Sequence, residues 1–166
     1  MDNAATVKST LSPKICTEID KWVAKYPADQ TQSAVMAALM IVQEDNDGWL
    51  TDELIHAVAD YLSMPVIAVY EVATFYSMYS LKPCGKHKIN ICTNISCQLC
   101  GSHEIVEHIQ QRLNIQFGET TADKQFTLCE VECMAACANA PMMQIDKTYY
   151  ENLTPEKVDE ILEQYK

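Results

Sequence analysis

The chain has 166 residues, of which 48% are hydrophobic and 21% are charged, and its formal net charge at pH 7 is -11. This length accommodates one domain or two small ones, and the composition is that of a chain with a packed core rather than a disordered one. The acidic balance argues against binding to nucleic-acid phosphates or to anionic lipid. The longest apolar runs, such as residues 34–42, are about half the roughly 20 residues that cross a bilayer. We therefore expect no nucleic-acid partner and no direct insertion into a membrane.

We expect no targeting signal at the start of the chain. Residues 1–14 lack the apolar core of a signal peptide and the Arg-rich face of an organelle-targeting peptide. We therefore expect the protein to work in a reducing cytoplasm. In that compartment eight cysteines favour metal binding or redox chemistry over a disulfide framework.

The first half of the chain is predicted to be helical, because apolar residues recur at helical spacing between short links. Ser12 and Thr51 are expected to act as N-caps, and Pro13 suits the first position of a helix. The four expected helices cover residues 13–26, 32–44, 52–62 and 65–79. This pattern indicates a small helical bundle, which we assign to an N-terminal domain of residues 1–82.

The pattern changes after a linker near residues 81–86. Alternating apolar residues predict strands, and two further segments have helical spacing. In chain order we expect a strand at 87–92, a helix at 102–113, strands at 126–131, 142–145 and 149–150, and a final helix capped by Thr154. Residues 83–166 thus form a small α/β layer with one sheet, and the whole chain belongs to the α+β class.

Six of the eight cysteines gather in two stretches, each at the end of an expected strand. We name residues 92–100 the first cysteine segment and residues 129–137 the second cysteine segment. Their cysteines are Cys92, Cys97 and Cys100 in the first, and Cys129, Cys133 and Cys137 in the second. Thiolates suit zinc, copper(I) or the iron of iron–sulfur clusters, and the spacings alone exclude neither zinc nor iron. Cys129 can also lie inside its strand and pack as a small hydrophobic residue.

The residues by themselves leave three interpretations open. The first is an iron–sulfur centre. The second is a thiol–disulfide oxidoreductase that uses Cys97 and Cys100, because this C-x-x-C pair follows a strand and precedes a helix. The third is an interaction module stabilised by zinc.

Four stretches carry a resemblance to a known family. They are Gly48-Trp49-Leu50, residues 72–76, residues 92–97 and residues 132–142. Together they resemble the 24-kDa subunit of NADH:quinone oxidoreductase (respiratory complex I), which is the E subunit of the bacterial enzyme. Related subunits occur in NAD-linked hydrogenases and formate dehydrogenases. The resemblance extends from about residue 12 to the end of the chain.

The resemblance implies a helical N-terminal part followed by a thioredoxin-like ferredoxin domain that binds one [2Fe–2S] cluster. The C-x4-C pair of the family falls on Cys92 and Cys97, and its C-x3-C pair falls on Cys133 and Cys137. It assigns no ligand role to the remaining cysteines, which are Cys16, Cys84, Cys100 and Cys129.

The resemblance also implies a partner and a place in the cell. The cluster is expected to exchange single electrons with the flavin of a neighbouring NADH-binding subunit, so that this chain serves an oxidoreductase without catalysing a reaction itself. FMN and NADH are expected on that partner, since this chain has no G-x-G-x-x-G fingerprint. The complex is expected to hold the chain in a peripheral arm at the cytoplasmic face of the inner membrane.

Two finer expectations concern the cysteine segments. Glu130 and Glu132 place negative charge near an anionic centre, which predicts a low reduction potential, on the order of −400 mV as in plant-type ferredoxins. Pro141 precedes an expected strand at the position where thioredoxin-like folds often hold a cis proline, so a cis peptide bond between Ala140 and Pro141 is expected.

Overall fold

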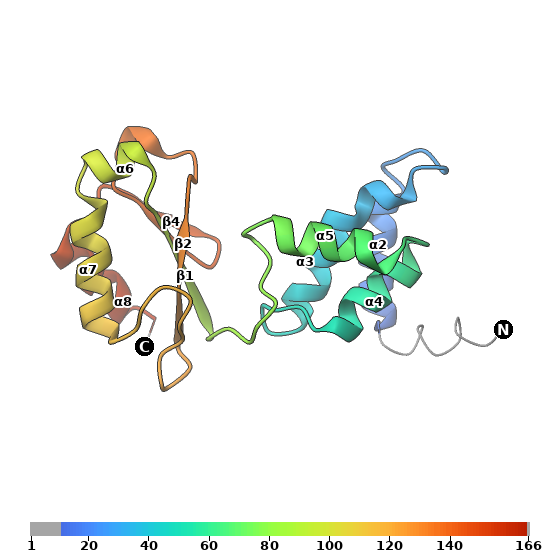
Figure 1. Ribbon diagram of the computed structural model, residues 1–166, viewed down its shortest axis with the longest axis horizontal. Helices are drawn as coiled ribbons and strands as arrows, with labels where there is room; N and C mark the ends of the chain where they lie inside the picture. Colours follow the sequence, from blue (N-terminus) through green and yellow to red (C-terminus); the bar gives the residue numbers. More distant parts are fainter. Residues whose placement is uncertain (1–10, 166) are drawn as a thin grey trace. The chain divides into compact units, whose positions relative to one another are not determined.

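The computed structural model describes residues 11–165, so residues 1–10 and 166 lie outside the description. Most of the stretch expected to lack a targeting peptide, residues 1–14, is therefore outside it too. The chain divides into two compact units between Pro83 and Cys84, each with its own hydrophobic core (Figure 1). We call them the helical unit and the sheet unit. The sequence places this division one residue earlier, and that the two units are domains in their own right stays a prediction.

The helical unit follows the predicted order of helices. Its elements are α2 (Pro13–Val23), the 3-10 helix η1 (Thr31–Ala34), α3 (Val35–Asp45), α4 (Asp52–Tyr61) and α5 (Val66–Phe75). Both predicted N-caps are confirmed: Ser12 accepts a hydrogen bond from the backbone N–H of Ile15, and Thr51 accepts one from that of Leu54. These bonds satisfy N–H groups that the first turn of a helix leaves without an intrahelical partner.

The predicted end of the fourth helix at Tyr79 is wrong, because α5 ends at Phe75. Gln43, which is buried, donates a hydrogen bond from Nε2 to the carbonyl oxygen of Met78 (3.1 Å). Its Oε1 accepts one from the backbone N–H of Ser80 (2.8 Å). These long-range bonds hold the segment after α5 against α3, and they compete with helical hydrogen bonds that the local pattern alone favours.

The sheet unit has the predicted order of strand, helix, strand, strand, strand, helix. A four-stranded sheet has the order β2-β1-β3-β4, in which β1 and β2 are parallel and the other two pairings are antiparallel. The strands are β1 (His87–Cys92), β2 (Phe126–Val131), β3 (Met143–Ile145) and β4 (Thr148–Tyr150). The helices are α6 (Ile95–Leu99), α7 (Ser102–Leu113), η2 (Cys137–Asn139) and α8 (Pro155–Glu163). The short helices α6 and η2 were not predicted.

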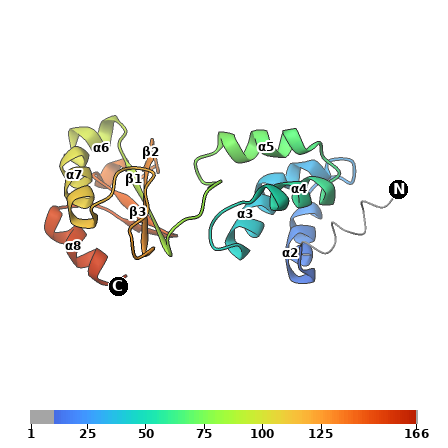
Figure 2. The same cartoon turned by 60° about the horizontal axis from the view of Figure 1, so that its bottom comes forward.

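Helices α7 and α8 lie on the same face of this sheet (Figures 1 and 2). The core between these helices and the sheet contains three completely buried strand residues, Ile89, Ile91 and Leu128. The parallel strands end in register, with Cys92 beside Val131. The carboxyl ends of adjacent parallel strands meet at one edge of a sheet, which is where α/β folds commonly place their ligands. The two cysteine segments therefore leave the sheet next to each other at that edge.

Among the described residues, every helix is too short or too polar to serve as a bilayer-spanning segment.

Candidate metal centre

The first cysteine segment holds two buried thiols. Cys92 is the last residue of β1, and Cys97 lies in α6, a helix whose N-cap Asn94 accepts a hydrogen bond from the backbone N–H of Ile95 (2.8 Å). Cys92 is 2% exposed and Cys97 is 1% exposed. Both pack against buried Met142, with Met134, Ala136 and Ala140 at the margin of this small apolar cluster.

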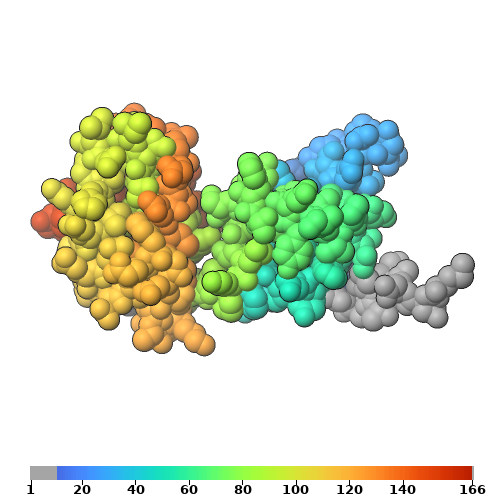
Figure 3. All heavy atoms as spheres, in the orientation of Figure 1, coloured from blue at the N-terminus to red at the C-terminus, as the bar shows by residue number. Residues whose placement is uncertain are grey.

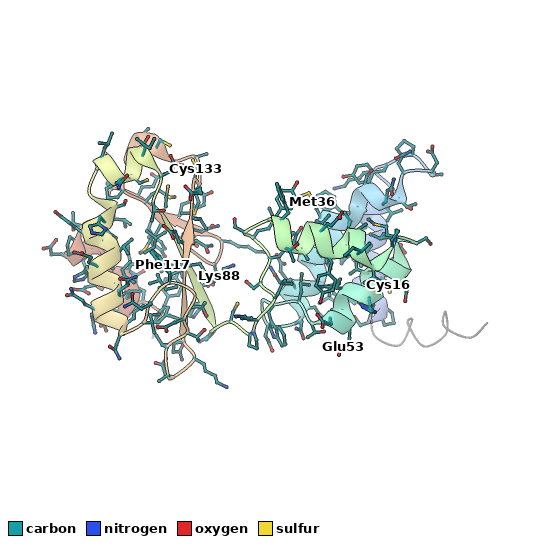
Figure 4. All side chains as sticks on the ribbon, in the orientation of Figure 1. Cys16, Met36, Glu53, Lys88, Phe117 and Cys133 are labelled. Atoms are coloured by element: carbon teal, nitrogen blue, oxygen red, sulfur yellow. The ribbon has the colours of Figure 1, made fainter. Side chains whose placement is uncertain are left out.

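The second cysteine segment begins in β2 and continues, from residue 132, as a loop. Cys133 lies in this loop and Cys137 begins η2, and both residues are exposed. The backbone N–H of Ala135 donates to Sγ of Cys133 (3.3 Å). The loop lies at the end of the sheet unit where α6 lies (Figures 1 and 4). In the space-filling view the two segments are neighbours on the surface of this unit (Figure 3).

Burial and the neighbouring thiols affect the pKa of the Cys97 thiol. Burial raises the pKa of the Cys97 thiol to about 11, helped by its hydrogen bond with Cys92 and by the negative charges of Cys92 and Cys137, while a backbone hydrogen bond with Met142 opposes the rise. Cys97 therefore has one thiol of each cysteine segment in its surroundings. Several thiolates together are unfavourable in such a place unless a cation compensates their charge.

The structure does not bring all four predicted ligands to one point. Among residues 11–165 no three side chains of His, Cys, Asp or Glu converge on a position for a single metal ion. Cys92 and Cys97 are in contact, Cys137 is within electrostatic reach of Cys97, and Cys133 lies in the same loop as Cys137. A binuclear iron centre takes two thiolates on each iron, so it does not require three around one position.

Comparisons with known proteins show the family of the chain. A family model described as thioredoxin-like [2Fe-2S] ferredoxin matches residues 19–166. The chain belongs to the thioredoxin-like [2Fe–2S] ferredoxin family. The resemblance to the 24-kDa subunit is confirmed as well: the E subunit of NADH-quinone oxidoreductase from Rickettsia felis is 46% identical over 143 residues, which cover 86% of each chain.

Two further comparisons concern a second relative and a solved structure. The mitochondrial NADH dehydrogenase (ubiquinone) flavoprotein 2 of Dictyostelium discoideum is 41% identical over 149 residues, covering 90% of this chain and 60% of that one. The crystal structure of an NAD+-reducing [NiFe]-hydrogenase in its air-oxidized state matches with a TM-score of 0.65 at 19% identity. The match covers 76% of this chain and 22% of the hydrogenase chain, and at this identity it shows the fold alone. The predicted fold class, a helical part followed by a thioredoxin-like domain, is confirmed.

The other cysteines of this family member have different surroundings. Cys129 lies half-buried in β2 opposite Asn90, and burial raises the pKa of its thiol although the charge of Lys88 opposes this. Cys100 is exposed at the end of α6, while Cys16 lies in α2 and Cys84 precedes β1. None of the eight cysteines, all of which belong to the described part of the chain, forms a disulfide.

Sequence reasoning missed the role of Met142. This residue was expected only as the start of a strand, yet it covers the thiols of Cys92 and Cys97, and its carbonyl oxygen accepts the backbone N–H of Cys92 (3.4 Å). The antiparallel register of Ile91 with Met143 explains this position, but a register is not visible in a sequence.

A side-chain contact between the two cysteine segments was missed for the same reason. Thr93 and Glu130 form this contact, because the pairing of β1 with β2 brings these two residues close together. The predicted cis peptide bond between Ala140 and Pro141, which leads into β3, is confirmed.

Proposed function

We propose that this chain is an electron-transfer subunit of an NADH dehydrogenase complex of the complex I type, and that Cys92, Cys97, Cys133 and Cys137 hold its [2Fe–2S] cluster. The observation that carries the proposal is the meeting of the two cysteine segments at the carboxyl ends of β1 and β2, in a chain of the thioredoxin-like [2Fe-2S] ferredoxin family. When bound, such a cluster takes up and releases one electron at a time.

The donor set fits this group. Sulfur ligands suit iron–sulfur iron, and the mutual influence of the thiols around Cys97 favours a cationic occupant. Met142 shields Cys92 and Cys97 from water. The N–H of Ala135 points at Cys133 Sγ, and hydrogen bonds of this kind orient a ligand sulfur and temper its charge.

We further propose that the partner is the flavin-bearing, NADH-binding subunit, with FMN and NADH bound there, and that this chain catalyses nothing alone. The names of the relatives from Rickettsia felis and Dictyostelium discoideum support a place in an NADH dehydrogenase. Ile95 and Leu99 of α6 are 70% and 84% exposed next to the buried thiols. Exposed apolar side chains beside an electron-transfer site suit contact with such a partner. The complex would hold the chain in a peripheral arm at the cytoplasmic face of the inner membrane.

The geometry favours the cluster over the dithiol alternative. A reactive dithiol needs an accessible thiolate, but Cys97, the first cysteine of the C-x-x-C pair, is buried and has a raised pKa. Only Cys100 of this pair is exposed. The zinc alternative uses the same thiols, so metal analysis of the purified protein is needed to distinguish bound zinc from bound iron.

Counting iron and acid-labile sulfide in serine variants tests the proposal. We expect about two irons and two sulfides per chain after anaerobic reconstitution of the wild type. Cys92→Ser, Cys97→Ser, Cys133→Ser and Cys137→Ser should each lose most of this iron. Cys100→Ser and Cys129→Ser are the matched controls and should retain it. A wild type that takes up zinc but no iron, or a Cys100→Ser variant as iron-poor as Cys92→Ser, contradicts the assignment.

A further inference from the structure

A side-chain contact joins the two cysteine segments, and it is made by residues other than the four proposed ligands. Thr93, which follows Cys92, donates a hydrogen bond from Oγ1 to Oε1 of Glu130 (2.8 Å). The backbone N–H of Thr93 donates to the carbonyl oxygen of Val131 (3.1 Å). One residue of the first segment is thus bound twice to the second segment, through a side chain and through the backbone.

Glu132 makes the neighbouring contacts in a different way. Its carbonyl oxygen accepts a hydrogen bond from the thiol of Cys92 (3.2 Å), and its carboxylate accepts only a long one from Asn94 Nδ2 (3.5 Å). At that length the bond contributes little. The strong carboxylate contact between the segments is therefore the one made by Glu130.

We propose that Glu130 is a positioning residue that holds the first cysteine segment against the second and also keeps the reduction potential of the site low. The inference rests on the proposed function. The Thr93 bond keeps the carboxylate next to the residue that follows Cys92. Its negative charge opposes the addition of an electron to an already anionic centre, because like charges repel. The same bond limits the movement of the two segments apart.

Positioning and charge can be separated by substitution. Glu130→Gln keeps an oxygen acceptor for Thr93 and removes the charge, whereas Glu130→Asp keeps the charge on a shorter side chain. Thr93→Val removes the donor and leaves the carboxylate. Glu160→Gln, at an exposed position of α8, makes the same change of net charge on an element without a cysteine and is the matched control.

The test is a one-electron redox titration of the reconstituted full chain, followed by electron paramagnetic resonance, with iron counted on each sample. We expect Glu130→Gln to raise the equilibrium constant for reduction about tenfold, a positive midpoint shift of about 59 mV. Glu160→Gln and Glu130→Asp should shift the midpoint by less than half of this. Thr93→Val should keep a midpoint near that of the wild type but lose iron to a chelator several times faster.

The outcomes separate this inference from the proposed function. A wild type without iron overturns the proposed function and this inference with it. If the wild type binds iron but Glu130→Gln has the same midpoint potential, the proposed effect of the Glu130 charge is wrong. If Thr93→Val loses iron no faster than the wild type, the proposed positioning role is wrong. Glu130→Gln should keep its iron, because its amide oxygen can still accept the Thr93 bond; iron loss from Glu130→Gln as fast as from Thr93→Val contradicts the separation of positioning from charge.

Discussion

The thiol of Cys92 donates a hydrogen bond to the carbonyl oxygen of Glu132, with 3.2 Å between Sγ and O. A sulfur that binds a metal is a thiolate and has no proton to donate, so a metal at Cys92 would exclude this hydrogen bond. If the four proposed ligands hold the metal, bonds from each cysteine segment to it would take the place of this contact.

The first prediction is that iron removal loosens the two cysteine segments and little else. Amide hydrogen exchange of residues 92–100 and 129–142 should be faster in the metal-free chain than in the reconstituted one, because metal bonds add to the stability of the ordered loops. Helices α3 and α4 serve as the internal control and should exchange equally in both forms. Equal protection of the cysteine segments in the two forms contradicts the assignment of the ligands.

The second prediction concerns the buried side chain of Gln43. Gln43→Met keeps the volume but removes both hydrogen bonds to the segment after α5. The carbonyl of Met78, an exposed residue, and the N–H of Ser80, a half-buried one, then lose these partners. An unsatisfied group costs about 1–3 kcal/mol when it is buried and less when water reaches it, so we expect the free energy of unfolding of the helical unit to fall by about 1–3 kcal/mol in a denaturant titration. Gln30→Met, at an exposed position, is the control and should change it by less than about 0.5 kcal/mol.

The third prediction is a loss of stability at alkaline pH that depends on Tyr79. Burial, with a smaller effect of Tyr76, raises the pKa of the Tyr79 hydroxyl from 10.0 to about 12. A raised pKa in the folded state stabilises that state below about pH 10, and this stabilisation is lost as the pH rises from about 10 to about 12. The free energies of unfolding of wild type and Tyr79→Phe, measured by denaturant titration between pH 8 and about 11, should therefore converge as the pH rises.

At neutral pH, Tyr79→Phe should cost about 1 kcal/mol, because it removes the hydrogen bond from the hydroxyl to the carbonyl oxygen of Met36 (2.9 Å). Tyr26→Phe, which removes an exposed hydroxyl from the same unit, is the matched control. Its free energy of unfolding should change with pH as that of the wild type does. Parallel curves for Tyr79→Phe and wild type up to pH 11 contradict this account of Tyr79.

The fourth prediction is that residues 83–166 fold without the helical unit, as the two-domain interpretation requires. The core of the sheet unit and the apolar cluster around Cys92 consist only of residues from this part of the chain. The fragment should unfold cooperatively and take up as much iron per chain as the full-length protein. A fragment that stays unfolded at neutral pH, or binds iron only when residues 1–82 are added, contradicts the division into domains.

Local patterns predicted most of the fold because the elements have local causes. Ser12 and Thr51 cap their helices through contacts three residues away, and alternation along residues 126–131 marked β2 at its observed bounds. The end of α5 was mispredicted because Gln43, far away in the sequence, binds Met78 and Ser80. The short helices α6 and η2 were missed because neither is long enough to show a helical period.

For the proposed site, which stays a prediction, the sequence indicates the cysteine pairs. Spacing placed the two cysteine segments after two strands, and the resemblance selected four cysteines. The cover that Met142 provides and the bond between Thr93 and Glu130 depend on strand register. The apolar pattern indicates which side chains face the core, but not which residue of one strand lies beside which residue of a distant strand.

Electron paramagnetic resonance of the anaerobically reconstituted, dithionite-reduced chain, with iron counted on the same sample, tests the presence of the [2Fe–2S] cluster directly. We expect a spin-one-half signal with about one spin for every two irons. Cys92→Ser should abolish this signal and Cys100→Ser should leave it intact. A reduced sample without a signal, with zinc or no metal bound to the chain, contradicts the account.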